Sequence, residues 1–252
     1  MVIIAYPFEK WKQLCYTVDG RTSCLYNQKR KNMPMKQKSV PLEDFKEVND
    51  WDTVIFLYKS ALKQIQTKID ILNDEFQNRH KYNPIEHVKA RIKTPESIVK
   101  KLKRYDYESS VENMVLYIND IAGIRITCSF TSDIYKIADM IANQNDLTVL
   151  SIQDYIKNPK KSGYRSYHML VTVPVFLSDV VVDTKVEIQI RTVAQDFWAT
   201  LEHKMHYKFE GEGPDYISRE LRECAGFVTL LDEKMEQLNV EIQKYGDKQN
   251  KS

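Results

Sequence analysis

The chain has 252 residues, of which 42% are hydrophobic and 29% are charged, and its formal net charge is only +2. This composition is typical of an ordinary globular protein and excludes a collagenous or wholly disordered chain. No apolar run approaches the ~20 residues that cross a bilayer, and the first residues lack the basic start of a signal peptide. We therefore expect a cytoplasmic protein with no membrane partner.

Glycine is scarce, and this limits the kinds of nucleotide site that the chain can form. Only 7 glycines occur, and none lies in a GxxxxGK[ST] or GxGxxG pattern. Both patterns cradle phosphates with backbone N–H groups, so a P-loop or Rossmann site is excluded. The four cysteines (Cys15, Cys24, Cys128 and Cys224) show no CxxC spacing and indicate reduced thiols. We expect Cys128 and Cys224 in the core.

The small net charge conceals an uneven distribution. Residues 89–104 contain seven cations and one acid, and residues 157–168 contain four cations and no acid. The other residues hold 26 Lys+Arg against 34 Asp+Glu. A basic site on an acidic body favours a polyanionic partner, which could be nucleotide phosphates, nucleic acid or a membrane surface. Two solvated lysine-rich stretches would give the same counts, so charge alone does not decide.

Both ends of the chain have helical or irregular patterns. Residues 1–40 show no sustained hydrophobic period, and we expect a partly disordered extension there. Apolar residues then recur at alternating spacings of four and three from Trp51 to Phe76, and again from Ile217 to Ile242, which predicts two long helices. Such helices suit coiled-coil-like packing, either against each other or across a subunit interface. Ordinary packing within the chain is equally open.

The middle of the chain changes to the period of two that is typical of strands. Residues 124–130 and 186–191 alternate apolar and polar side chains, which predicts strands with one buried face. Weaker strand patterns lie around residues 148–152 and 169–173, and residues 132–143 have a helical stripe.

These elements predict an α+β fold, in which a small mixed β-sheet is flanked by helices and by long N- and C-terminal helices. We expect one domain over residues 41–246. The extension over residues 1–40 precedes it, and a polar tail over residues 247–252 follows it.

A basic helix is predicted to begin at Thr94, which can cap its N-terminus, with Pro95 at the first position and Glu96 complementing the helix dipole. The helical period gives it a polar face with Ser97, Lys101 and Arg104, and an apolar face with Ile98, Leu102 and Tyr105. A polar face whose charges are all positive suits a polyphosphate, because a solvated face more often carries both signs.

The polar faces of the two main strands carry further candidates. Alternation places Arg125, Glu187 and Gln189 on the face opposite the apolar residues, and Asp120 lies just upstream of the first strand. Two carboxylates that face a cationic helix suit a Mg²⁺–nucleotide site, because this cation takes carboxylate and phosphate oxygens. An open sheet face with ordinary surface ion pairs would give the same pattern.

Two further segments contain aromatic or histidine candidates. In the loop over residues 159–168, lysines precede Tyr164, which could stack on a base or simply pack. His203 and His206 lie close together but match no HExxH pattern and have no evident third ligand. We interpret them as ordinary helix histidines and expect no zinc there.

Five segments taken together resemble the synthetase domain of the RelA/SpoT family: Arg91–Ile98, Lys100–Arg104, Asp120–Arg125, Gly163–His168 and Glu187–Thr192. The resemblance runs from about residue 42 to residue 245. The chain has no His-Asp dipeptide of the kind found in the hydrolase domain of the long members. It is therefore similar to the short, synthetase-only branch, the small alarmone synthetases, and residues 196–204 lean towards the RelP-type over the RelQ-type.

This resemblance implies a fold similar to polymerase-β-like nucleotidyltransferases, and it implies an enzyme. Family members are GTP pyrophosphokinases, which transfer pyrophosphate from ATP to the 3′-hydroxyl of GDP or GTP. Their products are AMP and the alarmones ppGpp and pppGpp. The resemblance also implies Mg²⁺ as cofactor, a homotetramer, and RNA as a candidate regulator, with no DNA partner.

Residue roles follow from the same resemblance. ATP would be bound by Arg91 and Arg125 stacking on adenine, and by Lys93, Ser97, Lys101 and Arg104 on the phosphates. Asp120 would bind Mg²⁺ with the help of Glu187. Tyr164 would stack on the guanine of the acceptor, which Lys160, His168 and Gln189 would also contact. Glu187 would activate the 3′-hydroxyl for in-line attack on the β-phosphorus of ATP.

Two other kinds of protein would share part of this pattern. A non-catalytic basic module could bind RNA through residues 89–104 and 157–168. The two carboxylates argue against it, because acids beside a phosphate backbone repel it unless a cation intervenes. A helical scaffold built on the two long helices would leave the cationic face of the basic helix unexplained.

Overall fold

The computed structural model describes residues 15–18, 21–24, 39–79, 82–208 and 215–249. The chain divides into two units, residues 1–38 and residues 39–252. In the first unit, β1 (Cys15–Val18) and β2 (Arg21–Cys24) pair as antiparallel strands. The rest of the expected extension lies outside the described residues, and so do the side chains of Cys15 and Cys24.

Six strands of the second unit form one mixed sheet in the order β4-β5-β8-β7-β6, with β3 paired to β8 beside this path. Their bounds are Ser39–Pro41 (β3), Ile85–Ile92 (β4), Ala122–Cys128 (β5), Thr148–Asp154 (β6), Tyr167–Phe176 (β7) and Val181–Thr192 (β8). β8 is parallel to β5 and β3, and the other neighbouring pairs are antiparallel. The predicted mixed sheet is confirmed, although its first predicted strand ends at Cys128, two residues early.

Helices are present over all four stretches where the sequence predicts them, at residues 51–76, 94–104, 132–143 and 217–242, and the structure adds further helices. The helices are α1 (Trp51–Arg79), α2 (Pro95–Arg104), α3 (Val111–Tyr117), α4 (Thr131–Ala142), α5 (Val193–Lys208) and α6 (Asp215–Gln249), with a short 3₁₀ helix, η3 (Leu42–Asp44). α6 continues into the stretch expected to be a polar tail. No helix within the described residues combines the length and apolarity that a membrane crossing needs.

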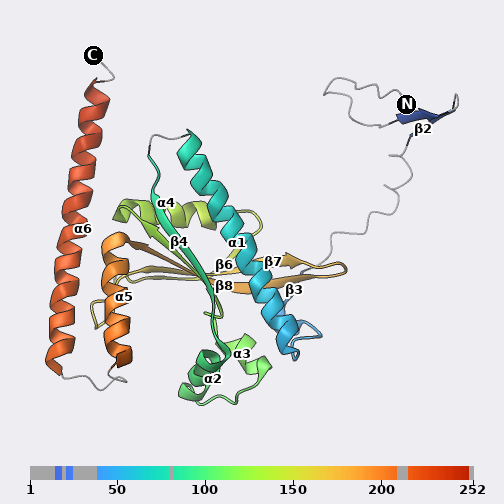
Figure 1. The fold of residues 1–252 in the computed structure, drawn as a ribbon, viewed down its shortest axis with the longest axis horizontal. Helices are drawn as coiled ribbons and strands as arrows, with labels where there is room; N and C mark the ends of the chain where they lie inside the picture. The colour runs from blue at the N-terminus through green and yellow to red at the C-terminus, as the bar shows by residue number, and fades with distance from the viewer. Residues whose placement is uncertain (1–14, 19–20, 25–38, 80–81, 209–214, 250–252) are drawn as a thin grey trace. The chain divides into compact units, whose positions relative to one another are not determined.

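The sheet has one covered face and one open face. Ile124, Ile126 and Ile188 are buried on the covered face. α1 and α4 both contact β5 and β8, and their buried side chains share one core with these strand residues. In Figure 1, α4 lies above strands β6 to β8, whereas α2 and α3 lie below them. Because side chains alternate along a strand, Arg125 and Glu187 point to the open face.

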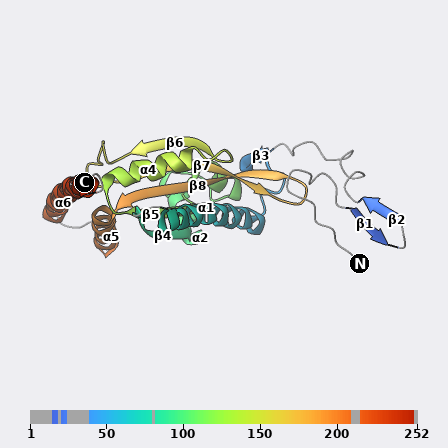
Figure 2. The ribbon, with the colours of Figure 1, turned by 90° about the horizontal axis from the view of Figure 1, so that it is seen from above.

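The two long helices do not pack against each other. α1 buries Leu57, Ile65 and Ile69 against the sheet, so its heptad spacing serves packing within the chain. α6 instead lies beside α5 at one end of the sheet (Figures 1 and 2). Of the alternatives left open by the sequence, pairing of the two helices with each other is excluded, because the sheet occupies the apolar face of α1.

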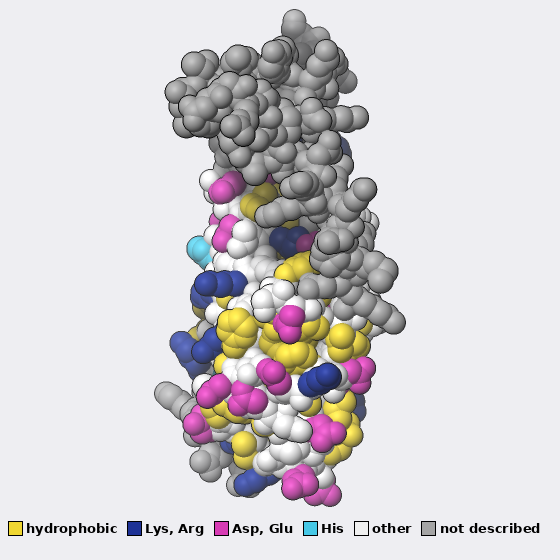
Figure 3. Space-filling view, turned by 90° about the vertical axis from the view of Figure 1, so that its right-hand side faces the viewer, with side chains coloured by type: hydrophobic (Ala, Val, Ile, Leu, Met, Phe, Trp, Pro, Cys, Tyr) yellow, Lys and Arg dark blue, Asp and Glu magenta, His cyan; other side chains and the backbone are white. Residues whose placement is uncertain are grey.

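α6 contacts the rest of the unit along one side only. Trp198, Ala199 and Ala225 form a small buried cluster between α5 and α6, separate from the main core. Several large apolar side chains of α6 remain exposed: Phe227, Leu230, Leu231, Met235, Leu238, Val240 and Ile242. Cys224 is exposed too, so the prediction of a core position is wrong for it, whereas it is confirmed for Cys128. The opposite side of the molecule shows hydrophobic, acidic and basic side chains interspersed (Figure 3).

The basic helix α2 begins as its sequence predicts. The Thr94 hydroxyl accepts a hydrogen bond from the backbone N–H of Ser97 at 3.3 Å, and Pro95 is the first helical residue. Ile98 and Leu102 are buried, as expected. Tyr105 is 49% exposed, so its predicted place on the apolar face is wrong. The helix ends at Arg104, and the helical phase no longer applies to the residue that follows.

Candidate active site

Strand pairing brings three candidate side chains into one row across the open face. Arg125 on β5 is paired with Gln189 on β8, and Gln189 is paired in turn with His168 on β7. Glu187 lies two residues before Gln189 and therefore shares its face, next to Gly123 of β5. The parallel β5–β8 pair thus assembles residues that are more than 60 positions apart in the chain.

Asp120 lies at one edge of this row, in the loop that leads into β5. Its two carboxylate oxygens accept hydrogen bonds from different ammonium groups, that of Lys93 at 2.7 Å and that of Lys101 at 2.8 Å. Lys93 is itself fixed because its backbone N–H donates to the carbonyl of Ile121 at 2.8 Å. Burial would raise the pKa of Asp120, but the bonds from Lys101 and Lys93 outweigh it and hold this pKa below its ordinary value.

Glu187 is the second carboxylate of the site. One of its oxygens accepts a hydrogen bond from the Gln189 amide at 2.8 Å, and the other lies 3.5 Å from Nδ1 of His168. Burial acts to raise its pKa, and so does the charge of Asp120, but the His168 and Gln189 contacts outweigh both and lower the pKa. The two carboxylates are therefore close enough to influence each other, and both are held in the ionised form.

An aromatic group flanks Glu187 on the side away from Asp120. The Tyr164 hydroxyl lies 2.9 Å from Nε2 of His168, and the rings of Tyr164, His168 and Tyr155 meet edge to face. The ammonium of Lys160 lies 4.6 Å from the centre of the Tyr155 ring and 4.9 Å from that of Tyr164. Tyr164, His168 and Lys160 are thus brought together, as the resemblance implied for an acceptor site.

Arg191 was not among the predicted site residues, but its guanidinium is buried beside Tyr164. Arg191 is only 4% exposed. It donates to the Tyr164 hydroxyl at 2.5 Å, to Gln189 Oε1 at 3.0 Å and to Asp196 at 3.3 Å. The alternation of β8 gave a signal for Arg191, because it shares the polar face of Glu187. Asp196 gave no such signal, because its partners come from other elements.

Asp196 also contacts the donor side of the row. Its carboxylate lies 3.1 Å from the Arg125 guanidinium. Burial, together with the charge of Arg191, lowers the pKa of Arg125. Nε of Arg125 is buried and finds no hydrogen-bond partner among the described residues. A buried donor without a partner costs free energy, so this atom is a natural contact for a bound ligand.

Three predicted ATP-binding residues lie outside the group of side chains that contact Asp120. Arg91 on β4 is paired with Gly123 and is exposed. Ser97 is exposed and its hydroxyl accepts from Thr94 at 3.0 Å, whereas the Arg104 guanidinium lies 5.3 Å from the Tyr105 ring centre. None of the three contacts Asp120 in the described structure.

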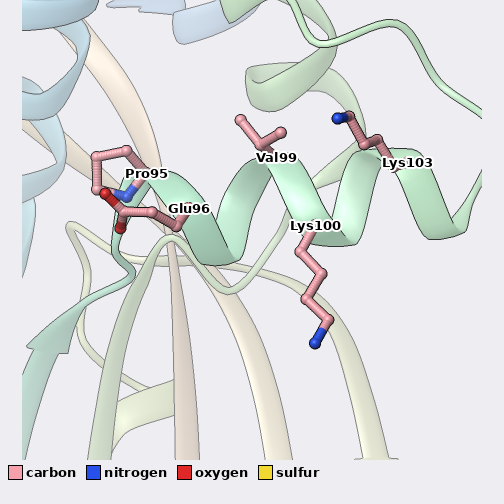
Figure 4. Close-up of a pocket in the computed structure, with 5 residues that line it drawn as sticks. All are labelled: Pro95, Glu96, Val99, Lys100 and Lys103. Carbon is pink, nitrogen blue, oxygen red and sulfur yellow. The ribbon is translucent and has the colours of Figure 1, made fainter.

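α2 also has an outward side, turned away from Asp120. There Pro95, Glu96, Val99, Lys100 and Lys103 line an open hollow of about 570 Å³ (Figure 4). Lys101 thus contacts Asp120, whereas Lys100 and Lys103 are exposed and line this hollow from different turns of the helix.

Asp120 and Glu187 are the carboxylates of this site that could hold Mg²⁺. Within the described residues, no group of three or more His, Cys, Asp or Glu side chains gathers in a way that could hold a metal ion. Asp120 and Glu187 fit the way this ion is usually held, through one or two carboxylates with the remaining ligands from phosphates and water. His203 is exposed on α5, and the side chain of His206 lies outside the described residues.

Comparisons with known proteins agree with this geometry. A family model described as "Region found in RelA / SpoT proteins" matches residues 90–212. The chain is 45% identical to the GTP pyrophosphokinase YwaC of Bacillus subtilis, over 80% of this chain and 96% of the relative. It is 34% identical to the GTP pyrophosphokinase YjbM of the same organism, over 77% of this chain and 90% of the relative.

Solved structures give the same result. The small alarmone synthetase 2 from Bacillus subtilis has a TM-score of 0.70 at 44% identity, covering 76% of this chain and 99% of its own. The small alarmone synthetase 1 from Bacillus subtilis bound to its product pppGpp has a TM-score of 0.72 at 34% identity. The match covers 77% of this chain and 98% of the synthetase chain. The present chain therefore belongs to the RelA/SpoT family, and within it to the small alarmone synthetases.

Proposed function

We propose that the protein is a GTP pyrophosphokinase, which transfers pyrophosphate from ATP to the 3′-hydroxyl of GDP or GTP and releases AMP. One observation carries this proposal. Two ionised carboxylates, Asp120 and Glu187, lie between a pair of lysines and an aromatic–histidine group on one open face. The relatives of this chain named above support it, since they include GTP pyrophosphokinases and a structure with pppGpp.

On the donor side, the proposed ATP site is formed by cations around Asp120. Lys93 and Lys101 would neutralise the phosphates, and their bonds to Asp120 hold both ammonium groups in place beforehand. Ser97 and Arg104 would contact the same phosphates from the exposed flank of α2. Arg125 would stack on adenine with Arg91, which lies across the β4–β5 pair.

On the acceptor side, Tyr164 would stack on the guanine. A tyrosine ring that is fixed at its hydroxyl suits this role, because base stacking needs a rigid aromatic face. Lys160, His168 and Gln189 would contact the rest of the acceptor nucleotide. His168 and Gln189 both contact Glu187, so a nucleotide held by them would lie near this carboxylate, and its ribose would have to face it for the reaction.

Glu187 would act as the general base. Its lowered pKa keeps it ionised at neutral pH, so it can accept the proton of the 3′-hydroxyl. The 3′-oxygen then forms a bond to the β-phosphorus of ATP while the bond from this phosphorus to the α–β bridging oxygen breaks. AMP leaves with that oxygen. Positioning and charge neutralisation supply most of the catalysis in reactions of this type.

Mg²⁺ is the cofactor that this site would use, held by Asp120 and Glu187 together with phosphate oxygens. When bound, it would neutralise charge that develops on the transferred group. The lysines at Asp120 already provide positive charge at this carboxylate, and they would share the phosphates with the ion.

We further propose that the protein assembles into a homotetramer through α6. The exposed apolar side chains of this helix support self-association, because a soluble monomer rarely leaves such a row uncovered.

RNA remains a proposed regulator, and the exposed Lys100 and Lys103 could contact its phosphates. We also propose a cytoplasmic location, which agrees with the use of ATP and GTP as substrates.

A product assay tests the function. Purified protein is incubated with Mg²⁺, ATP labelled at the γ-phosphate, and GDP, GTP or GMP in separate reactions. We expect labelled guanosine products that migrate more slowly than the acceptor, equimolar AMP, and no product when EDTA removes the metal. Label found only in inorganic phosphate, with ADP in place of AMP, would contradict the proposal. RNA binding without any product would favour the non-catalytic module.

A further inference from the structure

The loop that carries Tyr164 is a tight turn. The Gly163 N–H donates to the Lys160 carbonyl at 2.8 Å, and the Lys160 N–H donates to the Tyr164 carbonyl at 3.2 Å. Gly163 has a φ of +92°, in the region that favours glycine over residues with a side chain. The direction in which Tyr164 leaves this turn therefore depends on what lies against Gly163.

The surface that lies against Gly163 belongs to α6. A methyl group placed on Gly163 would lie 2.6 Å from Cβ of Ala225 and 3.7 Å from Cα of Arg222. The backbone of the turn thus contacts the helix directly at Ala225, which is only 6% exposed. Tyr164 itself packs against the cluster that contains Ala225 and Trp198.

α6 is in turn fixed to the elements that carry the rest of the site. The Trp198 indole N–H of α5 donates to the Leu221 carbonyl at 2.9 Å. Further along α6, Asp232 accepts from Thr192 Oγ1 at 2.8 Å, and Thr192 is the last residue of β8. These two hydrogen bonds lie before and after Ala225 along α6. They therefore fix the position of Ala225 relative to β8 and to Glu187.

We propose that Ala225 is a positioning residue for the acceptor nucleotide, acting through Gly163 to hold Tyr164 in its stacking orientation. This inference rests on the proposed role of Tyr164. A side chain larger than alanine at this position would push the turn away from α6 and tilt the Tyr164 ring. Asp120 and its two lysines come from the β4–α2 and α3–β5 segments, so the donor side would keep its geometry.

The test compares two neighbouring residues of α6. Ala225→Leu adds bulk against the turn and costs little helix propensity, because leucine is a good helix former. Gly226→Ala is the matched control, since a methyl group there would meet nothing within 4 Å. Ala225→Ser is the conservative variant, which adds one atom only. KM for GDP, KM for ATP, kcat and the melting temperature are measured for all three proteins and the native chain.

We expect Ala225→Leu to raise KM for GDP by about 10-fold or more, because a small displacement of a positioning group has large effects on binding. KM for ATP should stay near its native value, and both KM values of Gly226→Ala and Ala225→Ser should equal those of the native protein. The melting temperature of Ala225→Leu should fall because the contact is overpacked, and that of Gly226→Ala should rise slightly because alanine favours the helix. An unchanged KM for GDP would overturn the proposal, and so would equal changes in both KM values. If Ala225→Leu does not fold, Ala225→Val replaces it with the same criteria.

Direct GDP binding, measured by calorimetry, separates this proposal from the proposed function. If the native protein binds GDP but makes no product, the proposed function fails, and the ratio of GDP dissociation constants between Ala225→Leu and native protein still decides the role of Ala225. A ratio near one would overturn the proposed role of Ala225. If the native protein binds neither GDP nor GTP, both proposals fail.

Discussion

Asp120 and Glu187 differ in how their charge is maintained. Asp120 is bonded to two full positive charges, whereas Glu187 is bonded to an amide and lies near an imidazole. A carboxylate held by two ammonium groups is a poor proton acceptor, because protonation would break both ion pairs. Glu187 has neutral or titratable neighbours and is free of such pairing with lysine or arginine within the described contacts. The division of roles proposed above, with Glu187 as base, follows from this difference.

Replacement of Glu187 by glutamine tests this role. Glu187→Gln keeps the shape of the side chain but removes the proton acceptor, so we expect kcat to fall by about 10²- to 10⁴-fold while the melting temperature and ATP binding stay close to native. Glu75→Gln, at an exposed carboxylate of α1 on the covered side of the sheet, serves as the control and should leave kcat unchanged. A variant that loses its fold would assign Glu187 a structural role instead.

Stability should depend on pH through the same residue. Because the folded-state pKa of Glu187 lies below its ordinary value of 4.5, its ionised form stabilises the folded protein above pH 4.5. This contribution is lost as pH falls through the lowered pKa. We expect the free energy of unfolding of the native protein to approach that of Glu187→Gln as pH is lowered from about 6 to below 4.5, measured by urea titration. A difference that is constant over this range would contradict the assigned shift.

At the scale of elements, α6 is held by polar bonds as well as by apolar packing. Asp232 accepts from Thr192 at 2.8 Å and from Gln195 at 3.1 Å, and Glu236 accepts from the backbone N–H of Ser132 at 3.0 Å, at the start of α4. These bonds attach one helix to the end of β8, to α5 and to α4. They explain how α6 keeps its place although most of its apolar residues are exposed.

Two substitutions of Asp232 should have opposite consequences. Burial raises the pKa of Asp232, and this outweighs the bonds from Thr192 and Gln195 that lower it. The charged form is therefore disfavoured in the folded protein. It lowers the free energy of unfolding as pH rises above the ordinary pKa of 3.8. We expect Asp232→Asn to leave the melting temperature at pH 7 equal or higher, since its oxygen still accepts.

Asp232→Ala should instead destabilise the protein by about 1–3 kcal/mol, because it leaves the Thr192 and Gln195 donors without their acceptor. Thermal unfolding at pH 7 measures both variants side by side. If Asp232→Asn were as destabilised as Asp232→Ala, the ionised carboxylate would be required for attachment of α6, and the raised pKa would be the wrong explanation.

Most of the longer elements were predictable from sequence, because their signals are local, whereas β3, β4 and α3 were not predicted. The cap at Thr94 and the alternation that places Glu187 and Gln189 on one face both depend on a few adjacent residues. The contacts of Arg191 and Asp196 were not predictable, since they join the Tyr164 turn, β8 and α5 across the fold. The heptads of α1 and α6 predicted helices correctly. They could not say that one helix faces the sheet and the other is largely uncovered.

At the scale of the whole molecule, the exposed side of α6 predicts association. Leu230 is among its exposed apolar residues, and Ile71 on α1 is exposed to a similar degree, at 61% against 63%. Light scattering of the native protein should give four times the mass of one chain. Leu230→Glu should reduce this mass, because a charge in a buried interface is costly, whereas Ile71→Glu should leave it unchanged. A native protein that scatters as a monomer would contradict the assembly.

The uneven charge of the chain acquires a location in the folded protein. Cations from the segment 89–104 meet Asp120 at the edge of the open face, and Lys160 from the segment 157–168 lies over the aromatic rings at the other side of Glu187. The two basic segments therefore border one face from two sides. The central claim is that this face binds two nucleotides and joins them at the 3′-oxygen of the acceptor.

Comparison of GTP with 3′-deoxyGTP as acceptor tests this claim most directly. The two differ only in the oxygen that would attack ATP, so both should bind alike. In the presence of Mg²⁺ and ATP, the account predicts equimolar AMP and a pyrophosphorylated guanosine product with GTP, and neither above background with 3′-deoxyGTP. AMP release at the same rate with both acceptors would contradict it, because the 3′-oxygen would then not be the nucleophile.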